Sequence, residues 1–301
     1  VQHTLKLSCI DVGNIKSKKY KIVIDAVNSA GSEIIPYLLH YLDCDIVKIN
    51  CEGTGEFSRG PEPLPKNLSL LSQTVITEKA DFGLATDPDA DRLAIVDENG
   101  NPLGEEFTLA IAIDGFLQNS NDSNPVVVNL STSLLSEFAC KKHNIKLVRA
   151  KVGEINVVEE MKVLDSNIGG EGNGGVILKD SHLGRDSVVA TALVLNQFAN
   201  LNHSVSKIKD QFPNYILVKD KVSIFGLNPD VILTKIKTLF NDAIMDERDG
   251  LKLSWKSKWI HIRKSNTEPI MRIYAEAEDI KEISMSLDKI KNIIENSIDN
   301  K

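Results

Sequence analysis

Two stretches of the chain share an order of elements that constrains its fold more than any other feature. In the first, the apolar run Tyr20–Ala26 is followed by a polar turn at residues 28–31 and by a helical pattern from Ser32. Strand, small-residue turn and helix in this order open a βαβ unit. Residues 125–142 repeat the order. The sequence therefore predicts two similar α/β domains in tandem.

The pattern changes after a polar linker at residues 202–213. The elements expected beyond it are a strand at 215–218, a helix at 229–245, three close-set strands at 252–255, 259–262 and 270–275, and an amphipathic helix at 280–298. Several strands in succession between two helices predict an α+β domain with an antiparallel sheet.

Three domains are therefore expected. Residues 1–104 and 105–203 are predicted to be two tandem α/β domains with mixed sheets, and residues 204–301 a smaller α+β domain with an antiparallel sheet.

An acidic loop follows a predicted strand at residues 81–85. Asp87, Asp89 and Asp91 occupy alternate positions, and Arg92 closes the loop. Carboxylates this close repel one another unless a cation lies among them, and hard oxygen ligands suit Mg²⁺ or Ca²⁺. The loop also follows the carboxyl end of a predicted strand, where open α/β sheets bind ligands. A divalent metal site is therefore the leading hypothesis.

Two alternatives exist for this loop. A helix-loop-helix calcium site also begins with three alternating acids, and Glu98 falls at the twelfth position counted from Asp87. The sixth position, however, is Arg92 where that motif needs glycine, and both flanks have strand patterns. The second alternative is an acidic surface loop that binds no metal. Because the acidic loop lies between two predicted strands, a Mg²⁺ site is favoured over both alternatives.

A glycine-rich loop lies at residues 168–178. Five glycines occupy seven successive positions there, together with Glu171 and Asn173. Glycine lets a ligand approach the backbone, while a carboxylate and an amide can bond hydroxyl groups. This composition suits a polyol such as a sugar. The alternative is a glycine-rich hairpin without a ligand. Asp186, shortly after the loop, is interpreted as a helix N-cap.

A basic loop lies between the last two predicted strands, at residues 263–269. Its donor side chains, with one more just beyond it, are Arg263, Ser265, Asn266, Thr267 and Arg272. Two guanidiniums, two hydroxyls and an amide around a tight turn can surround one tetrahedral anion, and arginine suits bidentate phosphate contacts. The alternative is a basic surface hairpin that binds no anion.

Bulk properties limit the possible partners. The net charge of −7 argues against nucleic acid as a partner, and no apolar run approaches the roughly 20 residues of a membrane span. The four cysteines form no C-x-x-C pair, which favours reduced thiols and no zinc. We therefore expect a soluble cytoplasmic protein that contacts neither nucleic acid nor membrane. The chain begins at Val1, and its first nineteen residues resemble a lead-in to a domain.

Taken together, the three loops resemble those of the α-D-phosphohexomutase family, which includes phosphoglucomutase, phosphomannomutase and phosphoglucosamine mutase. They occur in family order, and the resemblance covers essentially the whole chain. It implies a mutase that interconverts hexose 1-phosphate and hexose 6-phosphate through a bisphosphate, with Mg²⁺ as cofactor and a hexose phosphate as substrate.

The resemblance also assigns roles to individual residues. Asp87, Asp89 and Asp91 would hold the metal, and Arg92 would act in catalysis beside them. Glu171 and Asn173 would bind sugar hydroxyls. The phosphate that does not react would be held by Arg263, Ser265, Asn266, Thr267 and Arg272.

Three departures from the family pattern limit this transfer. Asn173 stands where many members have serine, Glu154 where some carry a substrate-contacting histidine, and Asn129 where some carry lysine. We therefore assign only Lys151, near Glu154, a further role in substrate binding.

Family members have four domains, and the first carries a serine in a T-A-S-H-N-P type stretch whose phosphate completes the metal site. These 301 residues contain no such stretch. The chain is therefore expected to correspond to the second, third and fourth domains, to need the N-terminal domain of the same protein as a partner, and to be inactive and weakly metallated alone. The alternatives are a truncated, non-catalytic sugar-phosphate-binding paralogue and a phosphatase with Asp87 as nucleophile.

Overall fold

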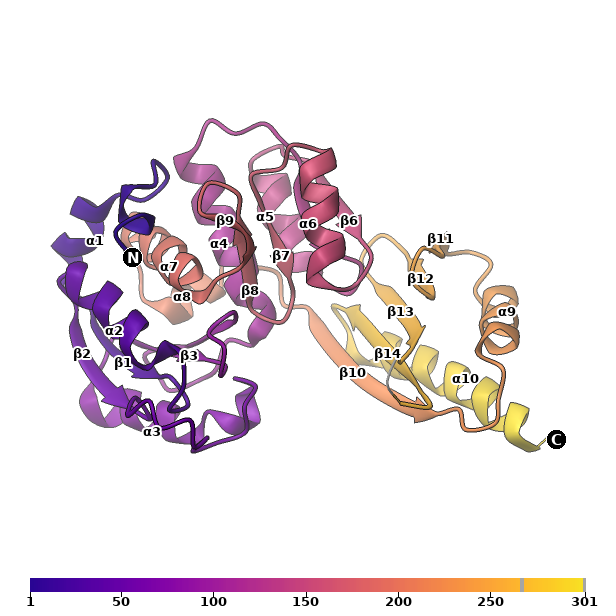
Figure 1. Ribbon diagram of the computed structural model, residues 1–301. Helices are drawn as coiled ribbons and strands as arrows, with labels where there is room; N and C mark the ends of the chain where they lie inside the picture. Colours follow the sequence, from indigo (N-terminus) through magenta and orange to yellow (C-terminus); the bar gives the residue numbers. More distant parts are fainter. Residues whose placement is uncertain (266–267, 300–301) are drawn as a thin grey trace. The chain divides into compact units, whose positions relative to one another are not determined.

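The computed structural model describes residues 1–265 and 268–299 of the chain. The chain divides into two compact units, Val1–Phe212 and Pro213–Lys301 (Figure 1). The helices of the first unit are η1 (Thr4–Lys6), α1 (Val12–Lys18), α2 (Gly31–Tyr41), η2 (Pro65–Asn67), α3 (Ser69–Glu78), α4 (Glu105–Asn119), α5 (Leu134–Lys142), α6 (Glu154–Val163), α7 (Ser187–Leu201) and α8 (Val205–Lys209).

The first sheet of this unit is mixed. Its strands are β1 (Lys21–Asp25), β2 (Asp45–Ile49), β3 (Phe82–Thr86) and β4 (Leu93–Val96), in the spatial order β2-β1-β3-β4. The strands β2, β1 and β3 are parallel, and β4 returns antiparallel to β3. The acidic loop is the connection between β3 and β4, at the carboxyl edge of the parallel strands.

The second sheet repeats this plan. Its strands are β5 (Val126–Asn129), β6 (Leu147–Ala150), β7 (Ile168–Glu171), β8 (Gly175–Leu178) and β9 (His182–Arg185), in the spatial order β6-β5-β7-β8-β9. The strands β6, β5 and β7 are parallel, and β8 and β9 are antiparallel to their neighbours. The glycine loop joins β7 to β8 and therefore lies at the carboxyl edge of this sheet.

One apolar core joins the two sheets of the first unit. The helix α7 contacts α1, α2, α4, β4 and β8, and its side chains are buried along most of its length. Phe198 of α7 packs edge-to-face on Phe82 of β3, with ring centroids 5.1 Å apart. The helix begins at Ser187 because Asp186 accepts hydrogen bonds from the backbone N–H groups of Val188 and Val189, which confirms the predicted N-cap.

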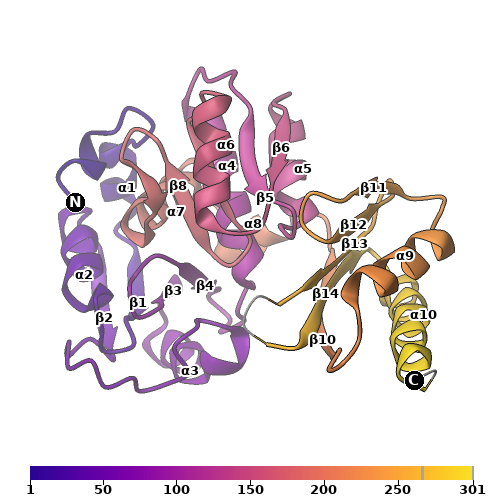
Figure 2. The same cartoon turned by 45° about the vertical axis from the view of Figure 1, so that its right-hand side comes forward.

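The second unit is an antiparallel sheet with helices on one face (Figure 2). Its strands are β10 (Ile216–Ser223), β11 (Ile244–Asp246), β12 (Leu251–Ser254), β13 (Trp259–Lys264) and β14 (Ile270–Ala277), in the order β10-β14-β13-β12-β11. The helices α9 (Pro229–Leu239) and α10 (Ile280–Asp299) cover the apolar face. The opposite face carries Lys219, Lys221, His261, Arg263, Arg272 and Tyr274.

The predicted fold class is confirmed. Two tandem α/β parts, each with a mixed sheet, precede an α+β unit with an antiparallel sheet. The helix predicted at 229–245 is too long. The helix α9 ends at Leu239, and Met245 instead pairs with Leu253 in the edge strand β11. Asn241 and Asp242, which favour helix ends and turns, separate the two elements. In the part of the chain that the structure describes, no helix combines the length and apolarity that a membrane crossing needs.

Candidate functional site

The acidic loop gathers its three carboxylates. One carboxylate oxygen each of Asp87, Asp89 and Asp91 lies within 4.8 Å of the others. Asp87 is buried, Asp91 is half-buried and Asp89 is exposed, so the cluster opens to solvent on one side. Among residues 1–265 and 268–299, no other group of three or more acidic, histidine or cysteine side chains lies close enough together to hold a metal ion.

The fold of the loop comes from Asp87. Its Oδ1 accepts hydrogen bonds from the backbone N–H groups of Asp91 at 3.1 Å and Arg92 at 3.0 Å. Ala90 takes a positive φ of 56° between them, which tightens the turn. Burial, followed by a side-chain hydrogen bond with Asp91 and its charge, raises the pKa of Asp87 to about 7. Burial and the neighbouring carboxylate therefore oppose the ionisation of Asp87 when no cation is bound.

The donor set fits a hard divalent cation. Oδ1 of Asp91 is buried and has no hydrogen-bond partner among the described residues, so one oxygen is left over for a ligand. Nε of Arg92 lies 3.2 Å from Oδ2 of Asp87 and 3.5 Å from Oδ1 of Asp91, and its Nη1 lies 3.0 Å from Glu62. A divalent cation among the carboxylates would relieve the repulsion that Arg92 offsets only in part.

In the glycine loop, Glu171 is anchored by the protein on both oxygens. Its Oε1 accepts hydrogen bonds from Nδ2 of Asn129 at 2.8 Å and from the N–H of Gly153 at 2.9 Å, and its Oε2 accepts one from Nη1 of Arg185 at 2.8 Å. The side chain is 7% exposed. Glu171 thus forms the floor of the loop.

Asn173 lies at the rim of the same loop. It is half-buried, and its Oδ1 accepts a hydrogen bond from the N–H of Gly175 at 3.2 Å. Its Nδ2 makes no hydrogen bond with any residue that the structure describes, so two donor hydrogens remain for a ligand.

Lys151 lies beside this loop because of the strand order. The adjacent parallel strands β6, β5 and β7 end at Ala150, Asn129 and Glu171, so Lys151 follows the carboxyl end of the sheet directly. The side chain is exposed, and its ammonium has no ion pair within the described ranges.

The acidic loop and the glycine loop are joined. The N–H of Leu93 donates to the carbonyl oxygen of Gly174 at 3.0 Å, and Arg185 reaches both Asp91 and Glu171. The structure thus brings Asp87, Asp89, Asp91, Arg92, Glu171 and Asn173 to one edge of the first unit.

Arg59 was missed by sequence reasoning. It forms a buried ion pair with Asp25 at 2.9 Å and donates from Nη2 to the carbonyl oxygen of Thr86 at 2.7 Å, which holds the end of β3 before the acidic loop. Arg185 and Glu62 were missed as well, and Glu154 was named only as a departure from the family pattern. Each is a single charged residue in a connection or at an element end, and no local pattern distinguishes it.

In the second unit, three cations form a row across adjacent strands. Lys221 of β10 and Arg263 of β13 both lie directly opposite Arg272 of β14. Nε of Arg263 is buried and has no hydrogen-bond partner among the described residues. Neighbouring like charges on one face destabilise a sheet, and an anion would relieve this repulsion.

The basic turn itself is described only in part. The N–H of Ser265 donates to the carbonyl oxygen of Ile270 at 2.9 Å, which closes the turn. Asn266 and Thr267 lie outside the described residues. A cavity of about 460 Å³ beside the row is lined by Lys219, Asp220, Lys221, Glu268, Ile270, Arg272 and Tyr274.

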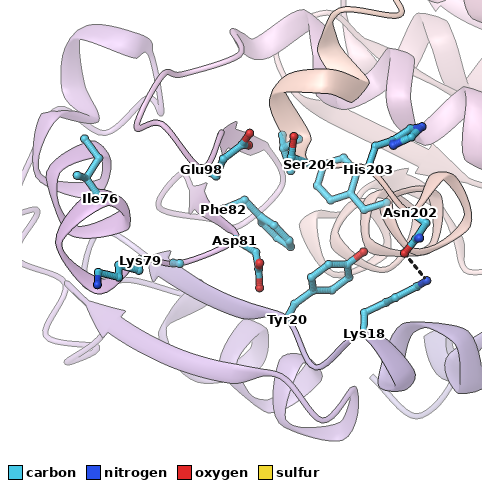
Figure 3. A pocket seen from close by; sticks show the side chains of 13 residues that line it. Lys18, Tyr20, Ile76, Lys79, Asp81, Phe82, Glu98, Asn202, His203 and Ser204 are labelled. Carbon is cyan, nitrogen blue, oxygen red and sulfur yellow. Dashed lines mark hydrogen bonds between the residues drawn. The ribbon is translucent and has the colours of Figure 1, made fainter.

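A separate cavity of about 600 Å³ lies in the first unit (Figure 3). Tyr20, Asp81 and Phe82 line it from the amino ends of β1 and β3, and Lys18 donates to Asn202 at 2.9 Å across its rim. The acidic loop follows the opposite end of β3. No residue of the acidic or glycine loop lines this cavity, so the cavity is separate from the candidate site.

The chain matches two family models. Residues 1–100 match phosphoglucomutase/phosphomannomutase α/β/α domain II, and residues 104–215 match α/β/α domain III. It is 37% identical to a phosphoglucomutase/phosphomannomutase of Thermococcus kodakarensis, over 89% of this chain and 59% of the relative. It is 35% identical to a phosphoglucosamine/phosphogalactosamine mutase of Sulfurisphaera tokodaii, over 96% of this chain and 65% of the relative.

The chain thus spans about three fifths of the length of these curated relatives. A crystal structure of a phosphoglucomutase/phosphomannomutase family protein from Burkholderia thailandensis shares the fold, with a TM-score of 0.81 and 21% identity over 95% of this chain and 63% of that one. The matched domains and relatives show that the chain belongs to the α-D-phosphohexomutase family.

Proposed function

We propose that the chain is the metal-, sugar- and phosphate-binding part of a phosphohexomutase that interconverts hexose 1-phosphate and hexose 6-phosphate through a bisphosphate. The observation that carries the proposal is the junction of the acidic and glycine loops, where Arg185 contacts Asp91 and Glu171. In this proposal residues 1–104 hold the metal, residues 105–203 the sugar and residues 204–301 the distal phosphate.

The acidic loop would hold Mg²⁺ through Asp87, Asp89 and Asp91. The clustered carboxylate oxygens support this assignment, as does Oδ1 of Asp91, which is buried and accepts no hydrogen bond from the described residues. When bound, the ion would neutralise charge on the transferring phosphoryl group. Arg92 would add a second positive charge beside Asp87 and Asp91, and positioning with electrostatic stabilisation carries such transfers.

The glycine loop would bind the sugar. Asn173 would donate a hydrogen bond from Nδ2 to a sugar hydroxyl. Glu171, at the floor of the loop, would accept hydrogen bonds from sugar hydroxyls with the lone pairs that its protein partners leave. Lys151, exposed and without an ion pair among the described residues, would contact the substrate from the end of β6.

The distal phosphate would bind in the second unit. Arg263, Ser265, Asn266, Thr267 and Arg272 would hold it, and Lys221 extends the cationic row on the same face. One clamp suffices because the bisphosphate carries phosphate at both ends and presents either one after it turns.

The phosphoryl donor would be a phosphoserine outside residues 1–301, on an N-terminal domain of the same protein. The serine phosphate would pass to the free hydroxyl of a hexose phosphate, which loses its proton, and the bisphosphate would then return its other phosphoryl group to the serine. The chain covers 59% and 65% of the length of two related mutases, which supports the assignment of the phosphoryl donor to another part of the protein. The chain alone would be inactive, and the free thiols of its four cysteines support a cytoplasmic location.

The test is a mutase assay on the full-length protein, with glucose, mannose and glucosamine phosphates followed by ³¹P NMR in the presence of Mg²⁺. We expect interconversion of the 1- and 6-phosphates of at least one sugar. Asp89→Asn should abolish most of the turnover, and Asp210→Asn, which changes an exposed aspartate outside the candidate site, should not.

Three outcomes would contradict the proposal. Inactivity of the full-length protein on all three sugars, with sugar-phosphate binding retained, would favour the non-catalytic paralogue. Release of inorganic phosphate by residues 1–301 alone would favour a phosphatase. Turnover that persists without divalent metal would exclude the role of the acidic loop.

A further inference from the structure

Arg185, the last residue of β9, reaches carboxylates from three separate elements. Its Nη2 pairs with Oδ2 of Asp91 in the acidic loop, and its Nη1 lies 2.8 Å from Oε2 of Glu171 at the end of β7. Its Nε lies 3.4 Å from Oε2 of Glu154 at the start of α6. The side chain is 13% exposed, so these contacts are largely shielded from solvent.

The surrounding backbone makes room for this side chain. A Cβ on Gly175 would lie 2.2 Å from Cδ of Arg185, closer than any real contact allows. The backbone N–H of Arg185 also donates to Oε1 of Glu154 at 2.8 Å, so Glu154 holds both the main chain and the guanidinium. The glycine at 175 therefore has a specific function: it lets Arg185 lie across the glycine loop.

The contact with Arg185 leaves one oxygen of Asp91 for the proposed metal. Arg185 occupies Oδ2 of Asp91, while Oδ1 of the same carboxylate is buried and lacks a hydrogen-bond partner in the described structure. A planar guanidinium can contact two carboxylates at fixed angles, whereas a lysine ammonium is a single point charge. Partners that orient a metal-ligating carboxylate in this way affect metal affinity.

We propose that Arg185 is a positioning residue that couples the two loops: it fixes the carboxylate of Asp91 for the metal and that of Glu171 for the sugar in one geometry. This inference rests on the proposed function. It goes beyond it because the proposed function gives Arg185 no contact with metal or sugar, and because a change in one loop is transmitted to the other through a single side chain.

A simpler role for Arg185 is charge neutralisation alone. In that case its removal would make the acidic loop more negative and tighten metal binding, and any cation of similar length would replace it. Positioning predicts the opposite, because loss of the fixed geometry weakens metal binding even when the charge is kept. Two variants keep the charge and disturb the geometry: Arg185→Lys, and Gly175→Ala, whose methyl group displaces Arg185.

The first measurement is hydrogen exchange of the 301-residue chain without metal, followed by mass spectrometry of peptides covering residues 86–93 and 169–176. In both variants we expect exchange to accelerate by about tenfold in both peptides, because both loops lose their common tie. Acceleration in one peptide only, or in neither, would overturn the coupling.

The second measurement is Mn²⁺ affinity of the same chain by electron paramagnetic resonance. Arg185→Lys, Gly175→Ala and Arg185→Met should each bind Mn²⁺ about tenfold to a hundredfold more weakly than the wild type. Tighter binding by Arg185→Met, or unchanged binding by the two charge-keeping variants, would show that only charge matters and would overturn the proposal.

Two matched controls accompany these variants. Arg248→Lys changes an exposed arginine whose ion pair lies in the second unit, and Gly13→Ala adds a methyl group that clashes with nothing in α1. Neither should alter exchange in the two peptides or Mn²⁺ affinity. Thermal unfolding without metal checks that each variant is folded.

The two proposals fail in different ways. The exchange measurement needs no metal, so it decides the role of Arg185 in every case. A wild-type chain that binds no Mn²⁺ would count against the proposed metal site, whereas unchanged exchange in Arg185→Lys and Gly175→Ala would count against Arg185 alone.

Discussion

Arg263 of β13 and Arg272 of β14 lie directly opposite each other in the antiparallel sheet of the second unit. Directly opposite residues have Cβ atoms about 4.5–5.5 Å apart on one face, where like charges are destabilising. Lys221 extends the row on the other side of Arg272. A fold that keeps three cations in a row gains stability when an anion binds among them.

This arrangement predicts opposite effects with and without phosphate. Without an anion, Arg272→Gln should raise the unfolding free energy by up to about 1 kcal/mol, because the like-charge repulsion that it removes outweighs the exposed ion pair with Glu268 at 3.9 Å that it also removes. With inorganic phosphate, the wild type should gain more thermal stability than the variant, because only the wild type keeps both guanidiniums. Calorimetry with and without phosphate measures both effects. Arg248→Gln, in an exposed ion pair, is the control, and equal stabilisation of all three proteins would exclude an anion site.

Asp89 should affect metal binding without affecting the fold. It is the exposed member of the carboxylate cluster. Asp89→Asn should weaken Mn²⁺ binding by at least about tenfold, because one of three charged ligands is lost. The unfolding free energy without metal should change by less than about 0.5 kcal/mol, as for other surface substitutions. Asp210→Asn should change neither quantity, and Mn²⁺ affinity equal to wild type in Asp89→Asn would contradict the metal site.

The buried pair of Arg59 and Asp25 should be essential for stability. Its side chains are 8% and 1% exposed. Arg59→Met leaves a buried carboxylate without its counter-ion, which should lower the unfolding free energy by about 3–5 kcal/mol. Lys179→Met, which breaks the more exposed pair with Asp165, should cost less than about 1 kcal/mol. Urea titration of both variants gives the comparison, and similar costs would disprove the prediction.

Gly174 combines a positive φ with a close approach. Its φ is 91°, and a Cβ there would lie 2.5 Å from the carbonyl oxygen of Leu93. Gly104 has a similar φ of 95° but no atom within 4 Å of such a Cβ, so it isolates the cost of the backbone conformation. Gly104→Ala should cost about 1–3 kcal/mol, because a φ of 95° with a ψ of 151° lies in a region that is essentially restricted to glycine. Gly174→Ala should cost about 1–3 kcal/mol more by urea unfolding, because the backbone of Leu93 must shift. Equal costs would show that the contact relaxes freely.

His261 should make stability depend on pH. Burial lowers its pKa from 6.5 to about 4; the nearby charges of Lys252 and Arg263 also lower it, while the hydrogen bond to the carbonyl oxygen of Asp249 opposes the shift. Between these values the unfolded chain binds a proton that the folded chain does not. Stability should therefore fall as the pH drops from 6.5 to 4, by at most about 3 kcal/mol from this residue, and level off outside that window.

The measurement for His261 is urea unfolding at several pH values, compared with His261→Gln. The variant lacks the titrating group, so its stability should decline less steeply across the window. Parallel curves for the two proteins would show that His261 does not contribute.

Local patterns predicted the elements best where neighbours in the chain decide the outcome. The acidic loop lies between two strands, and Asp186 caps α7, because both features depend on residues within a few positions. The helix at 229–245 was predicted too long, because the apolar spacing continues through Met245 while pairing with Leu253 draws that residue into the sheet. Periodicity does not reveal which of two partners an apolar residue will pack against.

The sequence by itself determined the chemistry of each loop: three carboxylates within five residues cannot lie far apart, and five glycines within seven leave the backbone open. Only the tertiary structure decided that Arg185 meets Asp91 across 94 residues of chain, and that Lys221, Arg272 and Arg263 stand in one row. The physical reason is that such contacts depend on strand order and register, which follow from packing of the whole core. The position of a single charged residue in the sequence therefore does not predict which distant residue it will contact in the folded protein.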